Sequence, residues 1–327
     1  MTIAEHVTQV ADNHDFDFSV SDNGVLAYQT GSNLSQLTWF DRTGKKLGTV
    51  GDPESYDSFA LSPDGQRAAT GLLDADGRQS DIWLLDLSRG TKSRLTSAPT
   101  SEGHPVWSPD GTQILFTSNR ETAQHFNLFT MSVNGAGDDK LALKADADDI
   151  PTSWSPDGQN VLFNRFTTTE HEGVWVLAMS GGREAKPLLQ SNAFLQEQAG
   201  FSPNGRLIAY VTDESGRSEV YVQTFPPGAK ATVSASGGAF PVWRGDGKEI
   251  FYLTSDGTIM SAQVKSESPF QTDVPRQLFQ TNIRFAPAVP YAVTRDGSRF
   301  LINTPAEANS PAPLTVVLNW TAGLKTK

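Results

Sequence analysis

The feature that most constrains the fold is a short turn sequence that recurs along the whole chain. Three copies of Ser-Pro-Asp-Gly and four close variants each end in a glycine. These glycines are Gly24, Gly65, Gly111, Gly158, Gly205, Gly247 and Gly297. Proline presets the turn, aspartate bonds back to the backbone, and glycine accepts positive φ. The spacing is about 45 residues, so seven units account for nearly all 327 residues.

The flanks of these turns repeat as well. An apolar residue precedes each turn, and a β-rich run such as QILFTS or LIAYVT follows it. A second run such as DIWLLDL and a shorter third run such as SRLTS come next. Each unit therefore reads as four strands, and a period of about 45 residues with four strands is typical of a β-propeller blade. We expect the seven tryptophans to pack between blades.

The pattern predicts an all-β fold, one seven-bladed β-propeller domain spanning residues 1–327. The last unit lacks a fourth run, and residues 3–10 resemble one, so we expect this N-terminal strand to close the ring and remove exposed sheet edges. A six-bladed ring is the alternative. The expected blades are about 16–50, 57–97, 104–143, 150–190, 198–235, 240–280 and 289–320 plus 3–10.

Composition excludes several classes of function. The chain has no cysteine, which rules out thiolate metal sites and cysteine nucleophiles. A net charge of −11 argues against nucleic acid as a partner. No run of about 18 apolar residues and no signal peptide is visible, so we expect no membrane insertion by this segment. A monomer is the expected state.

Several strings resemble known repeats. PVWSPDG, DIWLLDL and SRLTS look like the PD40 (WD40-like) repeats of TolB-type propellers. FSVSDNGVLAYQTG, WRGDGKEIFYL and PLTVVLNWTAGLK follow in an order similar to the propeller region C-terminal to membrane-anchored bacterial serine/threonine protein kinases. No kinase catalytic motif is present. The resemblance implies a sensor or protein-interaction module, located in the periplasmic or extracellular part of a membrane-anchored protein.

The chain carries no GxSxG, GxGxxG, P-loop or HExxH motif, so the sequence assigns no catalytic residue. In a propeller, the loops from each fourth strand to the next first strand surround the central opening, where binding residues concentrate. We expect a protein, peptide or small-molecule ligand there. The candidate binding residues are Asp15, Asp17, Tyr56, Asp57, Glu102, His104, Asp149, Glu197, Phe240, Arg284 and Phe285. Carboxylates dominate this set, which favours cations, amines or basic peptides.

Two alternatives remain open. One alternative is a divalent cation as cofactor. The carboxylates of these loops suit hard cations such as calcium or magnesium, and the one histidine also allows a transition metal. Its candidate ligands are Glu102, His104, Asp148 and Asp149. Such a centre would make the protein a metal-dependent hydrolase or lyase. The other alternative is a TolB-like structural scaffold. We expect His125 and His171 to be exposed loop residues.

Overall fold

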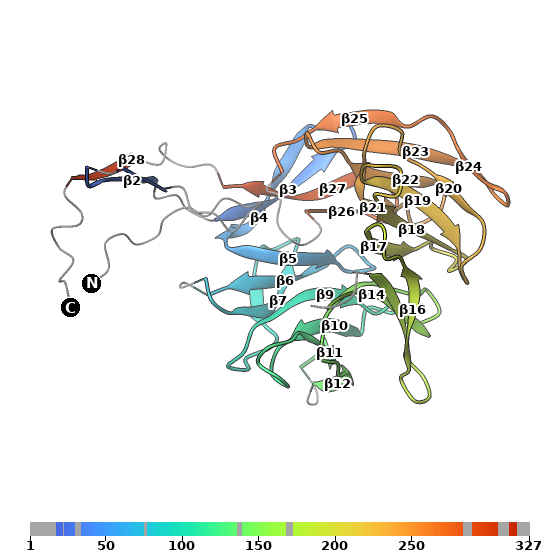
Figure 1. Ribbon diagram of the computed structural model, residues 1–327, viewed down its shortest axis with the longest axis horizontal. Helices are drawn as coiled ribbons and strands as arrows, with labels where there is room; N and C mark the ends of the chain where they lie inside the picture. The colour runs from blue at the N-terminus through green and yellow to red at the C-terminus, as the bar shows by residue number, and fades with distance from the viewer. Residues whose placement is uncertain are drawn as a thin grey trace.

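The computed structural model describes residues 18–21, 23–29, 34–74, 77–135, 139–167, 173–283, 290–306 and 314–318. Every regular element in these ranges is a β-strand, and neighbouring strands pair antiparallel. Within the same ranges there is no helix that could span a membrane. The all-β prediction is therefore confirmed (Figure 1).

Five sheets are built from strands that are consecutive in the chain. The first contains β5 (Tyr56–Leu61), β6 (Arg67–Leu73), β7 (Ser80–Asp86) and β8 (Lys92–Arg94). The second contains β9 (Glu102–Trp107), β10 (Gln113–Ser118), β11 (Asn127–Ser132) and β12 (Lys140–Leu143). The third contains β13 (Asp148–Trp154), β14 (Asn160–Phe166), β15 (Gly173–Ala178) and β16 (Ala185–Gln190).

The fourth sheet contains β17 (Gln196–Phe201), β18 (Leu207–Thr212), β19 (Glu219–Thr224) and β20 (Lys230–Thr232). The fifth contains β21 (Ala239–Trp243), β22 (Glu249–Leu253), β23 (Thr258–Glu267), β24 (Phe270–Thr272) and β25 (Arg276–Gln280). Its β23 is long enough to pair with both β24 and β25.

The two remaining sheets join segments from opposite ends of the chain. One contains β26 (Tyr291–Val293), β27 (Arg299–Pro305), β3 (Ser35–Asp41) and β4 (Lys46–Glu54), in that order. The other contains β1 (Phe18–Val20), β2 (Val25–Gln29) and β28 (Leu314–Leu318). Figure 1 shows β2 and β28 at the left, apart from the other sheets.

This pairing corrects the first and last expected blades. The sequence assigned 16–50 to one blade, but β3 pairs with β27 and not with β2. It assigned 289–320 plus 3–10 to another, but β28 pairs with β2. The expectation failed because it assumed that consecutive runs always pair. Residues 3–10, the expected closing strand, lie outside the described residues.

The repeated turns form as expected. In the second sheet the Ser108 hydroxyl donates to Asp110 Oδ1 at 2.6 Å and accepts from the Gln113 amide at 2.9 Å. Gly111 follows with φ +68°, a conformation that glycine tolerates best. Hydrogen bonds to the ionised carboxylate lower the pKa of Asp110. The turn thus sets the register of the hairpin β9–β10.

The core lies between neighbouring sheets. Phe116 and Ile114 of the second sheet pack with Ile82 of the first, and all three are fully buried. Leu301 of β27 packs with Tyr56 and Phe59 of β5. Phe300 of β27 also packs with Phe251 of β22. The sheet β26–β27–β3–β4 therefore lies between the fifth sheet and the first.

The tryptophans belong to this packing. Arg165 lies over Trp175 at 4.3 Å from the ring centroid, and Arg67 lies over Trp107 at 5.0 Å. Arg299 covers Trp39 at 4.7 Å. In each pair the guanidinium lies over the ring face, where the negative face of the ring attracts the positive charge.

Candidate functional site

The first strand of each of the six larger sheets lies next to the first strand of a neighbouring sheet. β5, β9, β13, β17 and β21 contact one another in that order, and β26 contacts β5. We call these six the inner strands. Side-chain hydrogen bonds join them: the His104 amide donates to Ser58 Oγ at 2.9 Å, and the Tyr291 hydroxyl donates to the Phe240 carbonyl at 2.8 Å. Their adjacent placement brings together residues far apart in the chain.

Three inner strands share an unusual backbone conformation at one equivalent position, four residues before the repeated turn. His104, Gln198 and Phe240 have φ of 51°, 56° and 53°, in the left-handed region that non-glycine residues rarely adopt. Each lies where the ladder register shifts at a β-bulge. Conformations of this kind persist where the surroundings fix them, and they cluster at binding sites.

The surroundings of these residues show how the bulges are held. Ser58 Oγ accepts from the His104 amide, and Gln198 Oε1 accepts from the Phe240 amide at 2.6 Å. The bulge leaves a backbone N–H group without a hydrogen bond to the neighbouring strand of its own sheet. A side-chain oxygen from another inner strand accepts the hydrogen bond of that N–H group instead. The three side chains remain half-buried on the inner strands.

Asp57 of β5 and His104 of β9 lie close together on neighbouring inner strands. The Asp57 carboxylate is half-buried, and no hydrogen bond or ion pair links it to another described residue. It packs against the backbone of Gly103: a Cβ on that glycine would lie 2.9 Å from Asp57 Oδ2. Burial lowers the pKa of His104, and the charge of Asp57 partly offsets that effect. The His104 imidazole next to Asp57 is therefore neutral at pH 7.

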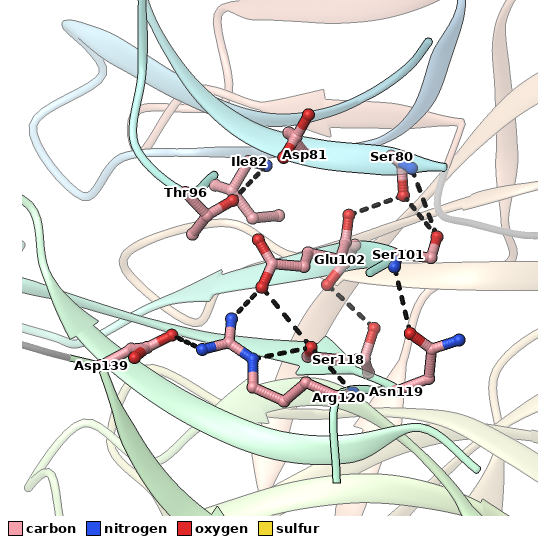
Figure 2. Close-up of polar contacts among 12 residues, drawn as sticks. Ser80, Asp81, Ile82, Thr96, Ser101, Glu102, Ser118, Asn119, Arg120 and Asp139 are labelled. Carbon is pink, nitrogen blue, oxygen red and sulfur yellow. Dashed lines mark hydrogen bonds and ion pairs between the residues drawn. The ribbon is translucent and has the colours of Figure 1, made fainter. Parts of the chain in front are cut away.

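Two predicted binding residues serve the protein interior instead. Glu102 is fully buried, and its Oε1 contacts the Arg120 guanidinium, which also contacts Asp139 (Figure 2). Asp149 is equally buried and makes two 2.7 Å contacts with Arg165. Figure 2 also shows the Ser80 hydroxyl donating to the Glu102 carbonyl, at 2.6 Å.

The other predicted residues have separate environments. Tyr56 packs in the apolar core with its pKa raised by burial, and Glu197 accepts a 3.0 Å hydrogen bond from Gln198 Nε2. Asp148 Oδ1 accepts from the Phe126 amide at 2.8 Å and lies 3.5 Å from His125 Nδ1. His125 is less exposed than the sequence suggested, with 28% of its side chain accessible. Four predicted residues lie outside the described residues: Asp15, Asp17, Arg284 and Phe285.

The candidate metal ligands do not form one cluster. Glu102 and Asp149 each contact an arginine, and Asp148 lies near His125. Among the described residues no group of three or more histidine, aspartate or glutamate side chains could hold a metal ion. The cationic partners Arg120 and Arg165 were missed because Arg165 lies in the second strand of its sheet and Arg120 directly after that of its own, away from the loops that the sequence indicated.

Sequence reasoning also missed Ser58, Gly103 and Gln198. Ser58, His104, Gln198 and Phe240 all lie four residues before the first residue of a repeated turn. Counting back from each turn would have identified this equivalent position without a structure.

Comparison with known proteins shows which domains this chain is similar to. Residues 42–170 match the family model described as PD40, TolB beta propeller domain. This part of the chain is therefore similar to a TolB β-propeller domain. A solved structure of a putative TolB from Agrobacterium tumefaciens has the same fold, with a TM-score of 0.64 and 16% identity over 84% of this chain and all of that one.

Other similar proteins differ in what they do. An uncharacterized peptidase, YuxL of Bacillus subtilis, is 33% identical over 36% of this chain and 19% of its own length. The oligogalacturonate lyase structure from Vibrio parahaemolyticus has a TM-score of 0.54 and 12% identity, and the match covers 94% of this chain and 82% of the lyase. The chain spans 19% of the length of YuxL and 58% of the length of the uncharacterized protein Atu1656 from Agrobacterium fabrum. The solved structures show the fold alone.

Proposed function

We propose that the chain is a non-catalytic binding module. In this proposal, the six larger sheets are six blades, and β3 and β4 close the ring by completing the sheet of β26 and β27. The contacts of β26 with β5 and of Phe300 with Phe251 support this closure. The inner strands then surround one opening, and the TolB-like domain acts as the rigid scaffold of a sensor or interaction protein.

The observation that carries the proposal is that three inner strands of this chain have the same bulge at the same position. Left-handed backbone at His104, Gln198 and Phe240 has no role in pairing the strands, since each residue interrupts its own ladder. Its consequence is to present half-buried side chains from equivalent positions on different inner strands. Such presentation suits a ligand that contacts several blades together.

The chemistry of the presented groups favours a cationic ligand, such as an amine or a basic peptide side chain. Asp57 offers a carboxylate without a described partner, and neutral His104 offers a ring nitrogen as acceptor. Phe240 offers an aromatic face, which attracts ammonium and guanidinium groups. The net charge of −11 steers cations toward the protein.

Calorimetric titration with tetralysine tests the proposal. Replacing Asp57 by Asn removes the charge and keeps the shape, so we expect affinity to fall roughly tenfold, since a charged hydrogen bond contributes about 1.5–3 kcal/mol. Asp52→Asn, an equal change of charge at an exposed position on β4, is the matched control. Equal affinity of Asp57→Asn and the wild type would overturn the proposal.

A further inference from the structure

The sheet of β1, β2 and β28 differs from the other sheets in its connectivity. In five sheets each strand pairs with the next strand of the chain, apart from the added β24. This rule is broken twice: β2 is followed by β3 but pairs with β28, and β27 is followed by β28 but pairs with β3. If consecutive strands paired throughout, β3 would be the third strand of the sheet of β1 and β2, and β28 the third strand of the sheet of β26 and β27. In the structure these two third strands are interchanged.

The two third strands occupy the same register. Val20 and Val293 are the residues directly before their turns, and they face Leu26 and Phe300 on the next strand. On the third strand, Leu26 faces Val317 and Phe300 faces Phe40. Counted from the turn, β28 and β3 therefore hold equivalent positions, and either strand can replace the other without a shift in register.

The sequences of the two strands agree with this equivalence. Leu37-Thr38 of β3 faces Asn303 and Ile302, and Leu314-Thr315 of β28 faces Gln29 and Tyr28 at the equivalent positions. The same dipeptide thus stands at equivalent positions of both strands. The strands differ at the next position, which is Trp39 in β3 and Val316 in β28.

The sheet of β1, β2 and β28 also exposes apolar side chains. The exposed fractions are 46% for Val20, 52% for Val316 and 70% for Leu318. Val20 and Val316 lie on opposite faces of the sheet, because Val20 is in line with Val317. A sheet with apolar side chains exposed on both faces resembles a blade taken out of a ring, since each blade is covered by a neighbour on both faces.

Specific contacts hold β3 in its present sheet. Asp41 faces Arg299 across the ladder, and Arg299 covers Trp39. Directly after β3, Arg42 donates to Glu249 of the fifth sheet at 2.6 and 3.1 Å. Glu249 is fully buried, so the pair is shielded from solvent on one side. β28 has only the apolar Leu318 at the position of Asp41.

We propose that β3 and β28 exchange places. The partner that fits the exposed sheet is the chain's own β3, which brings β4 with it, while β28 moves to β27. The exchange restores pairing of consecutive strands in both sheets, and it makes β1–β2–β3–β4 a four-stranded sheet like its neighbours. That sheet joins the ring as a seventh blade, which widens the opening between the inner strands. The inference does not depend on which ligand the opening takes.

Disulfide trapping tests the exchange, because the chain has no cysteine of its own. Leu318 faces Val25 in the present arrangement. After exchange it faces Arg299, which now faces Asp41. Facing residues lie about 4.5–5.5 Å apart at Cα, within the range that a disulfide spans. The variant Val25→Cys/Leu318→Cys therefore reports the present sheet, and Arg299→Cys/Leu318→Cys reports the exchanged one.

We expect both pairs to form a disulfide within one molecule under mild oxidation, identified by the mass of the linked peptides. The substitution Trp39→Val makes β3 resemble β28 and removes the ring that Arg299 covers. It should therefore favour the exchanged arrangement, in which Asp41 faces Val25. The pair Val25→Cys/Asp41→Cys should give a higher disulfide yield with Trp39→Val than with Trp39 in place. Leu318→Cys/Val274→Cys, which joins an exposed residue of β28 to an exposed residue between β24 and β25, is the control for random collision.

Two results would overturn the exchange. In the first, Arg299→Cys/Leu318→Cys links no more than the collision control, while Val25→Cys/Leu318→Cys links fully. In the second, the Arg299→Cys/Leu318→Cys disulfide joins two molecules, seen as a dimer on a non-reducing gel, which would make a second copy the partner of the sheet.

Discussion

Asp149 and Arg165 face each other across β13 and β14, and two nitrogens of the guanidinium lie 2.7 Å from the two carboxylate oxygens. The carboxylate is fully buried and the arginine side chain is 14% exposed. Burial raises the pKa of Asp149 despite the arginine. In the neighbouring sheet, Glu102 and Arg120 form another pair of a fully buried carboxylate and an arginine. These acidic groups therefore pair with arginines inside their own sheets.

Replacing Arg165 by Ala should destabilise the protein strongly, because it leaves Asp149 buried without its counter-charge. Loss of one partner of a buried pair costs about 3–5 kcal/mol of unfolding free energy. Urea denaturation measures the change. Arg94→Ala is the control, since Arg94 pairs with Asp81 at 2.7 Å but is 45% exposed, and exposed pairs contribute about 1 kcal/mol or less. Equal losses for the two variants would contradict the buried role of Asp149.

Replacing Gly103 by Ala should weaken binding of tetralysine without unfolding the protein. The added Cβ would lie 2.9 Å from Asp57 Oδ2, so the carboxylate must move away from its present place. Gly182→Ala is the matched control, because nothing lies within 4 Å of a Cβ at that position. Calorimetric titration compares the two. Unchanged affinity in Gly103→Ala would show that the position of Asp57 does not matter for the ligand.

The stability of the protein should fall between pH 7.5 and pH 5, and His104 should account for part of the fall. Burial lowers the pKa of His104 below its usual 6.5, so below about pH 6.5 the unfolded chain takes up a proton that the folded protein resists. The unfolding free energy therefore decreases as pH falls. Urea denaturation at both pH values should show a smaller decrease for His104→Asn. An identical decrease in both proteins would exclude this histidine as the cause.

Replacing Asp296 by Asn should destabilise the protein at pH 7 but not near pH 2. The hydroxyls of Thr294 and Ser298 donate to this carboxylate and lower its pKa to about 2. Stability from a lowered carboxyl pKa is present above the unfolded value and is lost as pH falls through the folded value. The side chain is largely exposed, so we expect a loss of about 1 kcal/mol at pH 7, measured by thermal unfolding. A loss that persists at pH 2 would contradict the link to ionisation.

Much of the fold could be predicted from the sequence because its local signals are strong. The repeated turn fixes each first hairpin through the same contacts, as Ser108 and Asp110 show. Strand pairing between the two ends of the chain carries no local signal. β3 and β28 share Leu-Thr and the same register, so the choice between them depends on contacts such as Arg42 with Glu249, which are 207 residues apart.

The candidate site was predicted only in part. Asp57 and His104 lie close together, whereas the buried Glu102 and Asp149 contact half-buried arginines. A sequence shows that a carboxylate is near a loop, but not whether an arginine from the next strand meets it. The left-handed bulges at His104, Gln198 and Phe240 were also invisible, because none of the three residues is a glycine that would mark the conformation.

The most direct test of ligand binding at the inner strands is an NMR titration of the histidine side chains with tetralysine. His104 lies beside Asp57, and His125 lies beside Asp148, so the two rings report on different acidic groups. Assignment uses the variants His104→Asn and His125→Asn. The account predicts a saturable shift of the His104 signal, lost in Asp57→Asn, with the His125 signal unchanged. A shift of His125 with no change at His104 would contradict it.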